Sequence, residues 1–340
     1  MKRNFVFLIS TLVGIALFVL VFYLFNIAKV FSHMFKIGPW GMGVFFINVF
    51  LIMLIGALSW QVILRAYGHN LPFKDVLIIK TIGFAISYLT PSMYIGGEPM
   101  RVYLMGKKHS VPMTRIGATV VVDKLLELGA ILFFVFLGSI YTLIYYRLPL
   151  QLFILLVLVN AFFLGAMVLL LINFIFKTKL FSKTINLLGK FKPLEKPVEV
   201  AAPFMLKLES EVFSAFGKHS KSTIQAFLLN LGIGSLIFVK PAIFFHFLRI
   251  TFNLSQLSLL YALTHLLLVL QFTPGAIGIF EWGEVGIFSI IGIQSEKALA
   301  YALMVRIADI LVVIAAAVTG FHMGVKYLWG KKRNEDLCGI

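Results

Sequence analysis

Long apolar segments alternate along the chain with short connectors that carry most of the basic residues. Six segments are predominantly apolar and about 20 residues long or longer, which is the length that an α-helix needs to cross a bilayer. They are Phe5–Ile27, Gly43–Leu64, Gly117–Tyr145, Gln151–Phe176, Thr223–Phe247 and Ala298–Tyr327. The pattern predicts an all-α, polytopic integral membrane protein with six full spans in a single membrane domain, residues 1–340.

Two further segments, Asp75–Tyr103 and Leu257–Ile293, are apolar but interrupted. Each contains a short helical stretch, a Thr-Pro break followed by glycines, and a second short helical stretch. Irregular backbone at membrane depth is tolerated only where it is buried in protein or lines a cavity. We therefore expect both segments to be re-entrant broken-helix hairpins, which enter and leave the membrane on one side.

The composition agrees with a chain that is solvated largely by lipid. Hydrophobic residues make up 60% of the 340 residues and charged residues only 13%, a balance typical of membrane proteins. The single cysteine, Cys338, excludes disulfides within the chain and thiolate metal sites. No sequence pattern indicates a metal or a cofactor. The first apolar run is longer than the core of a signal peptide and lacks a cleavage site, so it is expected to be a span.

The net charge of +16 indicates membrane orientation rather than nucleic-acid binding. The basic residues lie in connectors and tails, and such residues gather on the cytoplasmic side. This rule places the N-terminus, the loop 177–221 and the tail 331–340 in the cytoplasm, so the protein would be a multi-pass protein of the cytoplasmic membrane. The loop separates a first half, 1–176, from a second half, 222–330. If both broken segments crossed the bilayer fully, the loop would lie outside.

Apolar residues recur at helical spacing in two parts of the loop, Ser182–Leu194 and Val200–Phe216. This spacing favours amphipathic helices that lie at the membrane surface. A solvated linker between the two halves is the alternative.

The two broken segments resemble each other in sequence. Thr90–Arg101 reads TPSMYIGGEPMR and Thr273–Glu284 reads TPGAIGIFEWGE, with a glutamate seven residues after each proline. The following span carries a cation and, three residues later, an acid: Lys124 with Glu127, and Arg306 with Asp309. By the predicted topology the two copies enter from opposite sides. They would form an inverted repeat, an arrangement common among secondary transporters.

Ionisable residues in these apolar segments are the candidates for function, because a charge at the bilayer centre costs at least about 2.5 kcal/mol. The strongest candidates are Glu98, Arg101, Asp123, Lys124, Glu127, Glu281, Glu284, Arg306 and Asp309, with Lys80, Lys240 and His265 as weaker ones. One interpretation is structural. The cation–acid pairs close within their helices, or reach across to Glu281 and Glu98, and lock the repeats together.

The other interpretation is a substrate site at the breaks. The glycines Gly96 and Gly97 after Pro91, and Gly275 and Gly278 after Pro274, permit close approach of a ligand to the backbone. The restarting helices would offer free N–H groups to an anion. Arg101, Lys124 and Arg306 would add charge-assisted contacts, while Glu98 and Glu281 balance the cations, contact an amine or carry a proton. This inventory suits a phosphate-bearing head group.

No pattern supports an enzyme. The sequence has no H-E-x-x-H, G-x-S-x-G or P-loop motif. ATP is therefore not expected to drive transport, unless a partner supplies it. His246 and His265 on apolar segments are typical of helix packing.

The break motifs resemble those of the flippase-like family that includes the transmembrane region of lysylphosphatidylglycerol synthases. The residues that carry the resemblance are Pro91, the run Gly96-Gly97-Glu98-Pro99 with Arg101, the pattern Asp123-Lys124-x-x-Glu127, and Pro274-Gly275-x-x-Gly278-x-x-Glu281. An extra residue before Gly96, Asp123-Lys124 in place of Glu-Arg, and Ala276 in place of glycine depart from the family pattern and leave the substrate open.

The resemblance implies a lipid translocase. It would move a lipid with a charged head group, such as an aminoacyl-phospholipid or a polyprenyl-phosphate-linked lipid, and any synthase or transferase would be a separately encoded partner. The resemblance does not decide whether the protein forms a homo-oligomer. Two other functions compete: an ion- or proton-coupled transporter of a small anion, and a non-transporting membrane subunit of a lipid-modifying transferase.

Overall fold

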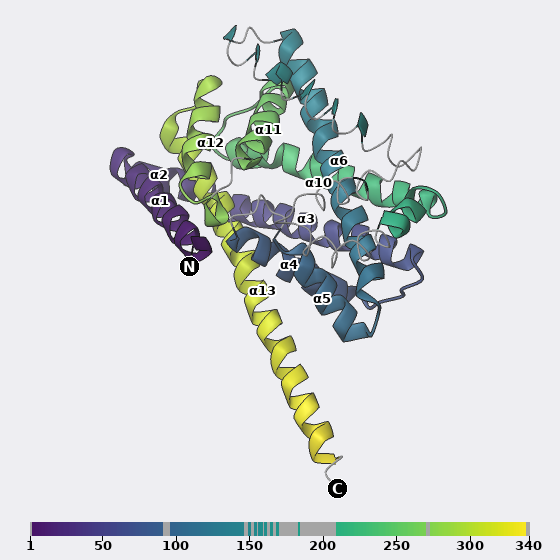
Figure 1. The fold of residues 1–340 in the computed structure, drawn as a ribbon. Helices are drawn as coiled ribbons and strands as arrows, with labels where there is room; N and C mark the ends of the chain where they lie inside the picture. The colour runs from purple at the N-terminus through teal and green to yellow at the C-terminus, as the bar shows by residue number, and fades with distance from the viewer. Residues whose placement is uncertain are drawn as a thin grey trace. The chain divides into compact units, whose positions relative to one another are not determined.

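The computed structural model describes residues 2–90, 96–145, 149–150, 209–269 and 273–337, with runs of one to three residues between 153 and 183. Most of these residues are helical, and no strand occurs among them. Figure 1 labels the elements. They are α1 (Lys2–Leu24), α2 (Ile27–Lys36), α3 (Gly38–Ala66), α4 (Phe73–Leu89), α5 (Glu98–His109), α6 (Met113–Tyr145), α10 (Ser220–His246), α11 (Leu254–Val269), η1 (Pro274–Ala276), α12 (Ile279–Ile290) and α13 (Ser295–Leu337).

Within the described residues, three helices are long and apolar enough to cross a membrane. They are α3, α10 and the Ser295–His322 part of α13, and they coincide with three of the six expected spans. Helices α1 and α6 cover two more of these spans. The span expected at Gln151–Phe176 and the helix expected at Ser182–Leu194 lie largely outside the described residues. The all-helical class is thus confirmed, while six full spans stay a prediction.

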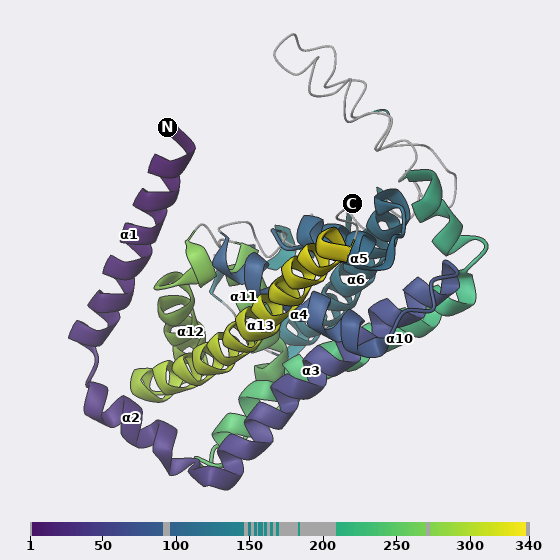
Figure 2. The same cartoon turned by 90° about the horizontal axis from the view of Figure 1, so that it is seen from below.

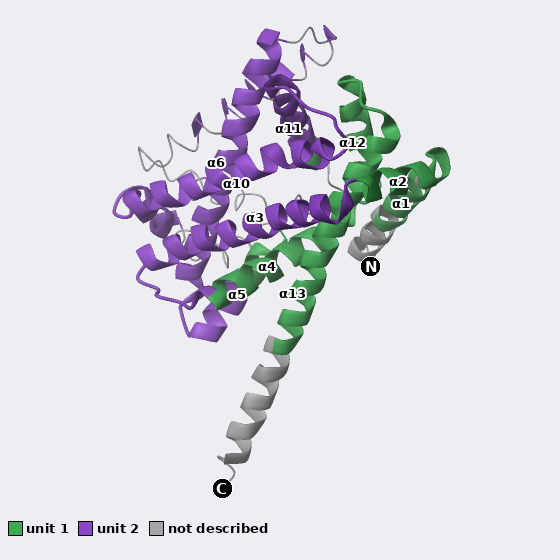
Figure 3. Cartoon of the chain, turned by 180° about the vertical axis from the view of Figure 1, so that it is seen from behind, with its two compact units in different colours: residues 1–36, 74–101, 267–340 green, residues 37–73, 102–266 purple. Residues whose placement is uncertain are grey.

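The chain folds into two compact units, each drawn from both halves of the sequence (Figure 3). Unit 1 comprises residues 1–36, 74–101 and 267–340, and unit 2 comprises residues 37–73 and 102–266. Unit 1 therefore holds almost all described residues of the first break and all of those of the second. The site described below is formed by these two segments, which are far apart in sequence but belong to the same unit.

Unit 2 is organised around α3 and α10, which lie side by side along much of their length (Figure 2). Small and polar side chains permit this close packing. Asn230 on α10 donates to the Ser59 hydroxyl at 2.8 Å, and Ser59 donates to the Ala226 carbonyl. Trp60 donates to the Thr119 hydroxyl on α6. The hydrogen bonds satisfy polar groups that would otherwise be costly to bury.

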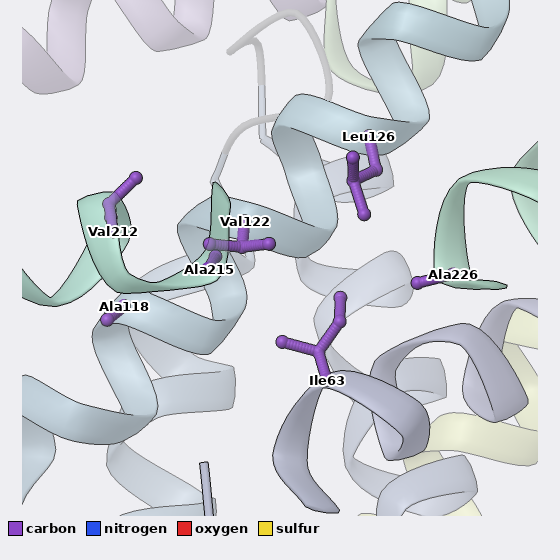
Figure 4. Close-up of a cluster of buried hydrophobic side chains, with 7 residues drawn as sticks. All are labelled: Ile63, Ala118, Val122, Leu126, Val212, Ala215 and Ala226. Carbon is purple, nitrogen blue, oxygen red and sulfur yellow. The ribbon is translucent and has the colours of Figure 1, made fainter. Parts of the chain in front are cut away.

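A hydrophobic cluster in unit 2 joins α3, α6, α10 and a helix formed by residues 209–216 (Figure 4). Its buried members are Ile63, Ala118, Val122, Leu126, Val212, Ala215 and Ala226. Residues 209–216 are the described part of the amphipathic helix expected at Val200–Phe216. Their apolar residues Val212 and Ala215 pack on protein, so this part does not depend on the membrane surface for burial.

Unit 1 brings α1 against the second break. A Cβ atom on Gly14 would lie 3.0 Å from the Ile277 carbonyl oxygen, so the absence of a side chain lets the backbones approach. The indole N–H of Trp282 on α12 donates to the Leu17 carbonyl of α1 at 3.1 Å. The Phe25 ring packs against the Trp282 ring in a tilted arrangement, with centroids 5.7 Å apart. These contacts fix α12 against the first helix of the chain.

Helix α2 presents three different faces. Val30 and Met34 are buried, and α2 packs on α13. Phe31 and Phe35 are exposed one turn apart, with ring centroids 6.4 Å apart. The polar face carries lysines. Aromatic residues on one face and lysines on another are typical of a helix that lies in the membrane–water interface.

Lys29 and Lys36 carry the positive charge of α2 at neutral pH. Both side chains are exposed. Burial, with the ammonium groups of Lys36 and Lys297 nearby, lowers the pKa of His33, so this imidazole is neutral at pH 7. We therefore expect these two lysines to be the groups of α2 that attract anionic head groups.

A spin label at position 35 is expected to contact lipid, and one at position 32 to contact water. Cys338 is the single native cysteine, so Cys338→Ala provides a background without thiols. In vesicles, a label on Phe35→Cys should be relaxed more by molecular oxygen than by a water-soluble nickel chelate, and a label on the exposed Ser32→Cys should show the reverse. Equal accessibilities at the two positions would contradict an interfacial α2.

Candidate functional site

The second break is a tight turn that only small residues can form. Gly275 and Gly278 have φ angles of 60° and 80°, and Ala276 has a φ angle of 50°. Left-handed backbone of this kind is unfavourable for side chains with a Cβ atom. Thr273 accommodates the turn with a hydrogen bond from its hydroxyl to the Ile277 carbonyl at 3.1 Å. The turn leads directly into α12, which begins at Ile279.

Glu281 closes the first turn of α12. Its Oε2 accepts a hydrogen bond from the Gly278 N–H at 2.8 Å, and its side chain is 0% exposed. A carboxylate in the first turn of a helix is stabilised by the free N–H groups and the positive end of the helix dipole. The sequence predicted a ligand anion at this helix end. In the structure, a carboxylate of the protein itself occupies it.

Arg306 on α13 donates all five of its N–H groups to protein oxygens. Its Nε and Nη2 donate to Glu281 Oε1 at 2.8 and 2.7 Å, and its Nη1 donates to the Tyr88 hydroxyl at 2.6 Å. The remaining bonds go to the backbone carbonyls of Gly275 and Ala276. Arg306 is 7% exposed, and its guanidinium also lies over the Phe280 ring. Arg306 therefore acts as a clamp that holds the second break closed.

Tyr88 connects the two broken segments. It lies near the end of α4, just before the first break, and is 4% exposed. Besides accepting the bond from Arg306, its ring lies so close to Gly275 that a Cβ atom there would be 3.0 Å from the Tyr88 Cε1. The two broken segments, expected from sequence to be equivalent, are thus in direct contact within unit 1, where Tyr88 of the first meets Gly275 of the second.

At the first break, two glycines allow the start of α5 to pack directly against α4. A Cβ atom on Gly97 would overlap the Gly83 carbonyl of α4, so α5 begins in backbone contact with α4. The Gly97 N–H donates to the Ser87 hydroxyl at 2.8 Å. Arg101 is 4% exposed, and a Cβ on Gly83 would be 2.5 Å from its Cγ. Pro91 lies outside the described residues.

The N–H groups that open the restarting helices are therefore used by the protein. At the first break a serine hydroxyl accepts this bond, and at the second a glutamate carboxylate does so. The Gly97 and Gly278 N–H groups are therefore not available to a ligand, while an anion site at the N–H groups of the helices themselves stays a prediction. These two groups are used because a helix N-terminus buried in protein requires an acceptor, and each segment supplies one from its own sequence.

The cation–acid pairs of the two halves are not arranged alike. Lys124 Nζ lies 3.2 Å from Glu127 Oε1 on the same helix, with side chains 31% and 35% exposed. Arg306 instead reaches Glu281, 25 residues away in sequence. Both arrangements were considered in the structural interpretation. Asp123 and Glu284 are buried, at 0% and 1% exposure, and Glu98 and Asp309 are half-buried.

Tyr88, Phe280 and Ser87 belong to the site and were not identified from the sequence. Tyr88 and Phe280 surround the Arg306 guanidinium, and Ser87 accepts the bond from Gly97. Tyr88 stands three residues before Pro91, at the end of an apolar stretch. The available signal in the sequence was a tyrosine within an apolar stretch beside a break, because a tyrosine O–H at membrane depth needs a hydrogen-bond partner.

Comparison with known proteins relates the chain to one family. A family model described as the Lysylphosphatidylglycerol synthase TM region matches residues 7–317. The UPF0104 membrane protein MJ1595 of Methanocaldococcus jannaschii is 25% identical over 268 residues, covering 78% of this chain and 79% of the relative. The UPF0104 membrane protein PH1989 of Pyrococcus horikoshii is 24% identical over 272 residues, covering 75% and 78%. The motif resemblance is thereby confirmed along most of the sequence.

Proposed function

Because the chain belongs to the family of the lysylphosphatidylglycerol synthase TM region, we propose that it translocates a lipid with a charged head group across the cytoplasmic membrane. The contact of two broken membrane segments through a buried cluster of Tyr88, Glu281 and Arg306 carries this proposal. Broken helices that meet inside a membrane domain are typical of secondary transporters. The chain itself leaves the lipid chemically unchanged, and both of its ends lie in the cytoplasm.

The residues divide into two groups in this proposal. Arg306 and Glu281 hold the second break, because their hydrogen-bonding capacity is directed to the protein. Lys124 and Glu127 are about one-third exposed and pair with each other at 3.2 Å on α6. They can meet a head group without the loss of a buried ion pair. Lys124 would contact a phosphate, and Glu127 an amine or hydroxyl.

All N–H groups of Arg306 donate to oxygens of the protein. This observation favours one other candidate function, a non-transporting membrane subunit of a lipid-modifying transferase. In that role the charged residues would serve assembly alone, and a separately encoded transferase would be the partner. Charge removal at Lys124 would then leave any lipid movement unchanged, while loss of Arg306 would release the partner. A coupled transporter of a small anion is the third candidate, and it would move an anion without acyl chains.

Reconstitution in liposomes distinguishes the three. Purified protein is placed in vesicles that contain a fluorescent phosphatidylglycerol, its aminoacyl derivative or a polyprenyl phosphate, and movement between leaflets is followed by quenching of the outer leaflet. Lys124→Gln is expected to slow movement about tenfold or more, because a charge-assisted contact to phosphate is lost. The matched control is Arg65→Gln, which removes an exposed cation at the end of α3 and should change the rate less than about twofold.

The alternatives give different results. Flux of inorganic anions with no lipid movement would indicate the small-anion transporter. No movement of any lipid class under any ion gradient, together with co-purification of a transferase, would indicate the subunit. Equal rates for Lys124→Gln and Arg65→Gln would remove Lys124 from the substrate path.

A further inference from the structure

Helix α4 and the start of α5, residues 96–101, are locked together as one body, which we call the first hairpin. A Cβ atom on Gly97 would overlap the Gly83 carbonyl, so the two helices touch through their backbones. The Gly97 N–H donates to the Ser87 hydroxyl at 2.8 Å. The Arg101 side chain lies across Gly83, where an added Cβ would be 2.5 Å from the Arg101 Cγ. A movement of α4 would therefore carry the start of α5 with it.

One face of α4 carries contacts of the first hairpin with the second half of the chain. Ile82, Ala85 and Tyr88 are spaced three residues apart, so they lie on one side of the helix. A Cβ atom on Gly320 of α13 would be 3.5 Å from the Ile82 Cδ1. One on Gly275 would be 3.0 Å from the Tyr88 Cε1. Ala85, between these two contacts, is 7% exposed. Glycine presents no side chain that interlocks with α4 at either contact, so the surfaces there can separate without a change of rotamer.

The hydrogen bonds of Arg306 fall on both sides of this interface. Its Nε and Nη2 donate to Glu281 Oε1 at 2.8 and 2.7 Å, within the second half. Its Nη1 donates to the Tyr88 hydroxyl at 2.6 Å, across the interface. Loss of the bond to Tyr88 leaves the charges of Arg306 and Glu281 paired, whereas loss of the ion pair would isolate two buried charges. The bond to Tyr88 is therefore the one that can break at the lower cost.

We infer that Tyr88 is a latch that holds the first hairpin closed on the second break and releases it in an open state. In the closed state the Tyr88 hydroxyl accepts from Arg306 and the ring covers Gly275. In the open state the hairpin moves away as one body, and Arg306 stays anchored to Glu281. Movement of one repeat against the other is how secondary transporters change access. The role of the latch in lipid movement thus rests on the proposed function, but opening is measured without transport.

Tyr88→Phe is expected to favour the open state, because it removes the hydroxyl and keeps the ring. A cysteine in place of Ala85 reports opening, since a thiol buried on this face of α4 reacts with N-ethylmaleimide from molecules in which the hairpin has moved away. The measurement uses purified full-length protein in detergent with Cys338→Ala as background. Tyr88→Phe should raise the modification rate of Ala85→Cys about tenfold or more, the equilibrium effect of losing a hydrogen bond to a charged group.

Two controls separate the latch from a general loss of stability. Ala57→Cys places a thiol in unit 2 at a position with 0% exposure, and Tyr88→Phe should change its modification rate by less than about twofold. Tyr67→Phe removes a hydroxyl of unit 2 that donates to the Glu211 carbonyl at 2.6 Å. This variant should lower the melting temperature and leave the modification rate of Ala85→Cys within about twofold of its value with Tyr67.

The outcomes test the latch and the proposed function separately. An unchanged rate for Ala85→Cys in folded Tyr88→Phe would overturn the latch. Equal acceleration at Ala85→Cys and Ala57→Cys would also overturn it, because Tyr88 would then have a purely structural role. Acceleration confined to Ala85→Cys, in a protein that moves no lipid in vesicles, would contradict the proposed translocation and leave the latch standing.

Discussion

Replacing Arg306 with alanine is expected to lower the free energy of unfolding by about 3–5 kcal/mol, which is the usual cost of removing one partner of a buried ion pair. The Glu281 carboxylate would stay buried, at 0% exposure, without its cation. The Tyr88 hydroxyl and the Gly275 carbonyl would lose their bonds to the same guanidinium. Unfolding by denaturing detergent, followed by circular dichroism, measures the loss.

Two further variants separate the clamp from a general effect of charge. The double variant Arg306→Met, Glu281→Gln should recover much of the stability, because the isolated charge is removed along with its partner. Arg306→Lys should recover little, since an ammonium cannot reach all the oxygens that a guanidinium fork reaches. Arg65→Ala, at an exposed position of α3, should change stability by less than about 0.5 kcal/mol. A loss for Arg306→Ala no larger than that of Arg65→Ala would refute the clamp.

The second large effect is expected at Gly278, where alanine should cost about 2–5 kcal/mol. The φ angle of 80° disfavours any residue with a Cβ atom by about 1–2 kcal/mol. The added carbon would also lie 2.5 Å from the Leu17 Cβ and 2.7 Å from the Gly14 carbonyl oxygen of α1. Overpacking of this kind typically costs about 1–3 kcal/mol more. The melting temperature in detergent is the simplest measure.

Gly286 provides the matched control on the same helix, α12. It is exposed, lies inside the helix, and an added Cβ would meet nothing within 4 Å. Gly286→Ala should therefore stabilise the protein by about 0.5–1 kcal/mol, because alanine favours helix more than glycine does. Glycine to alanine is thus expected to destabilise the protein at position 278 and to stabilise it at position 286, eight residues further along the chain. The same sign at both would show that the α1–α12 contact is not as described.

The sequence identified which residues matter at the second break, but not how they are connected. Glu281 and Arg306 were found because charges in apolar segments are costly and stand out. Their mutual ion pair was only one of several combinations, since spacing along the chain also allowed Arg306 to pair with Asp309. Tyr88 was missed because a single tyrosine in an apolar stretch carries no periodic signal, and its partner is 218 residues away.

The equal spacing of the repeats also suggested more symmetry than the side chains have. Lys124 and Arg306 occupy matching positions, yet the first closes on its own helix and the second reaches the break. Lysine has one flexible donor group, whereas arginine has a planar fork that can bridge several oxygens. The residue type, rather than the offset, thus decides the partner.

Helix positions followed well from hydrophobic pattern, and the grouping of helices did not. The apolar runs predicted α3 and α10 within five residues at each end and the start of α13 within three, although α13 continues ten residues beyond the predicted end. They contained no indication that residues 74–101 and 267–340 share a unit, because apolar surfaces in lipid are not specific for one neighbour. The specific contacts come instead from glycines and single polar side chains, such as the bond from Asn230 to Ser59.

The Glu281 carboxylate, which is covalently part of the chain, occupies the N-terminal end of α12. A group fixed three residues away acts at an effective concentration in the millimolar range or above, which a free anion must exceed in order to replace it. Small inorganic anions at cellular concentrations would therefore lose this competition at Gly278, even though the helix end is well suited to hold them. Glu281 thus acts as a built-in competitor for any anion at this helix end.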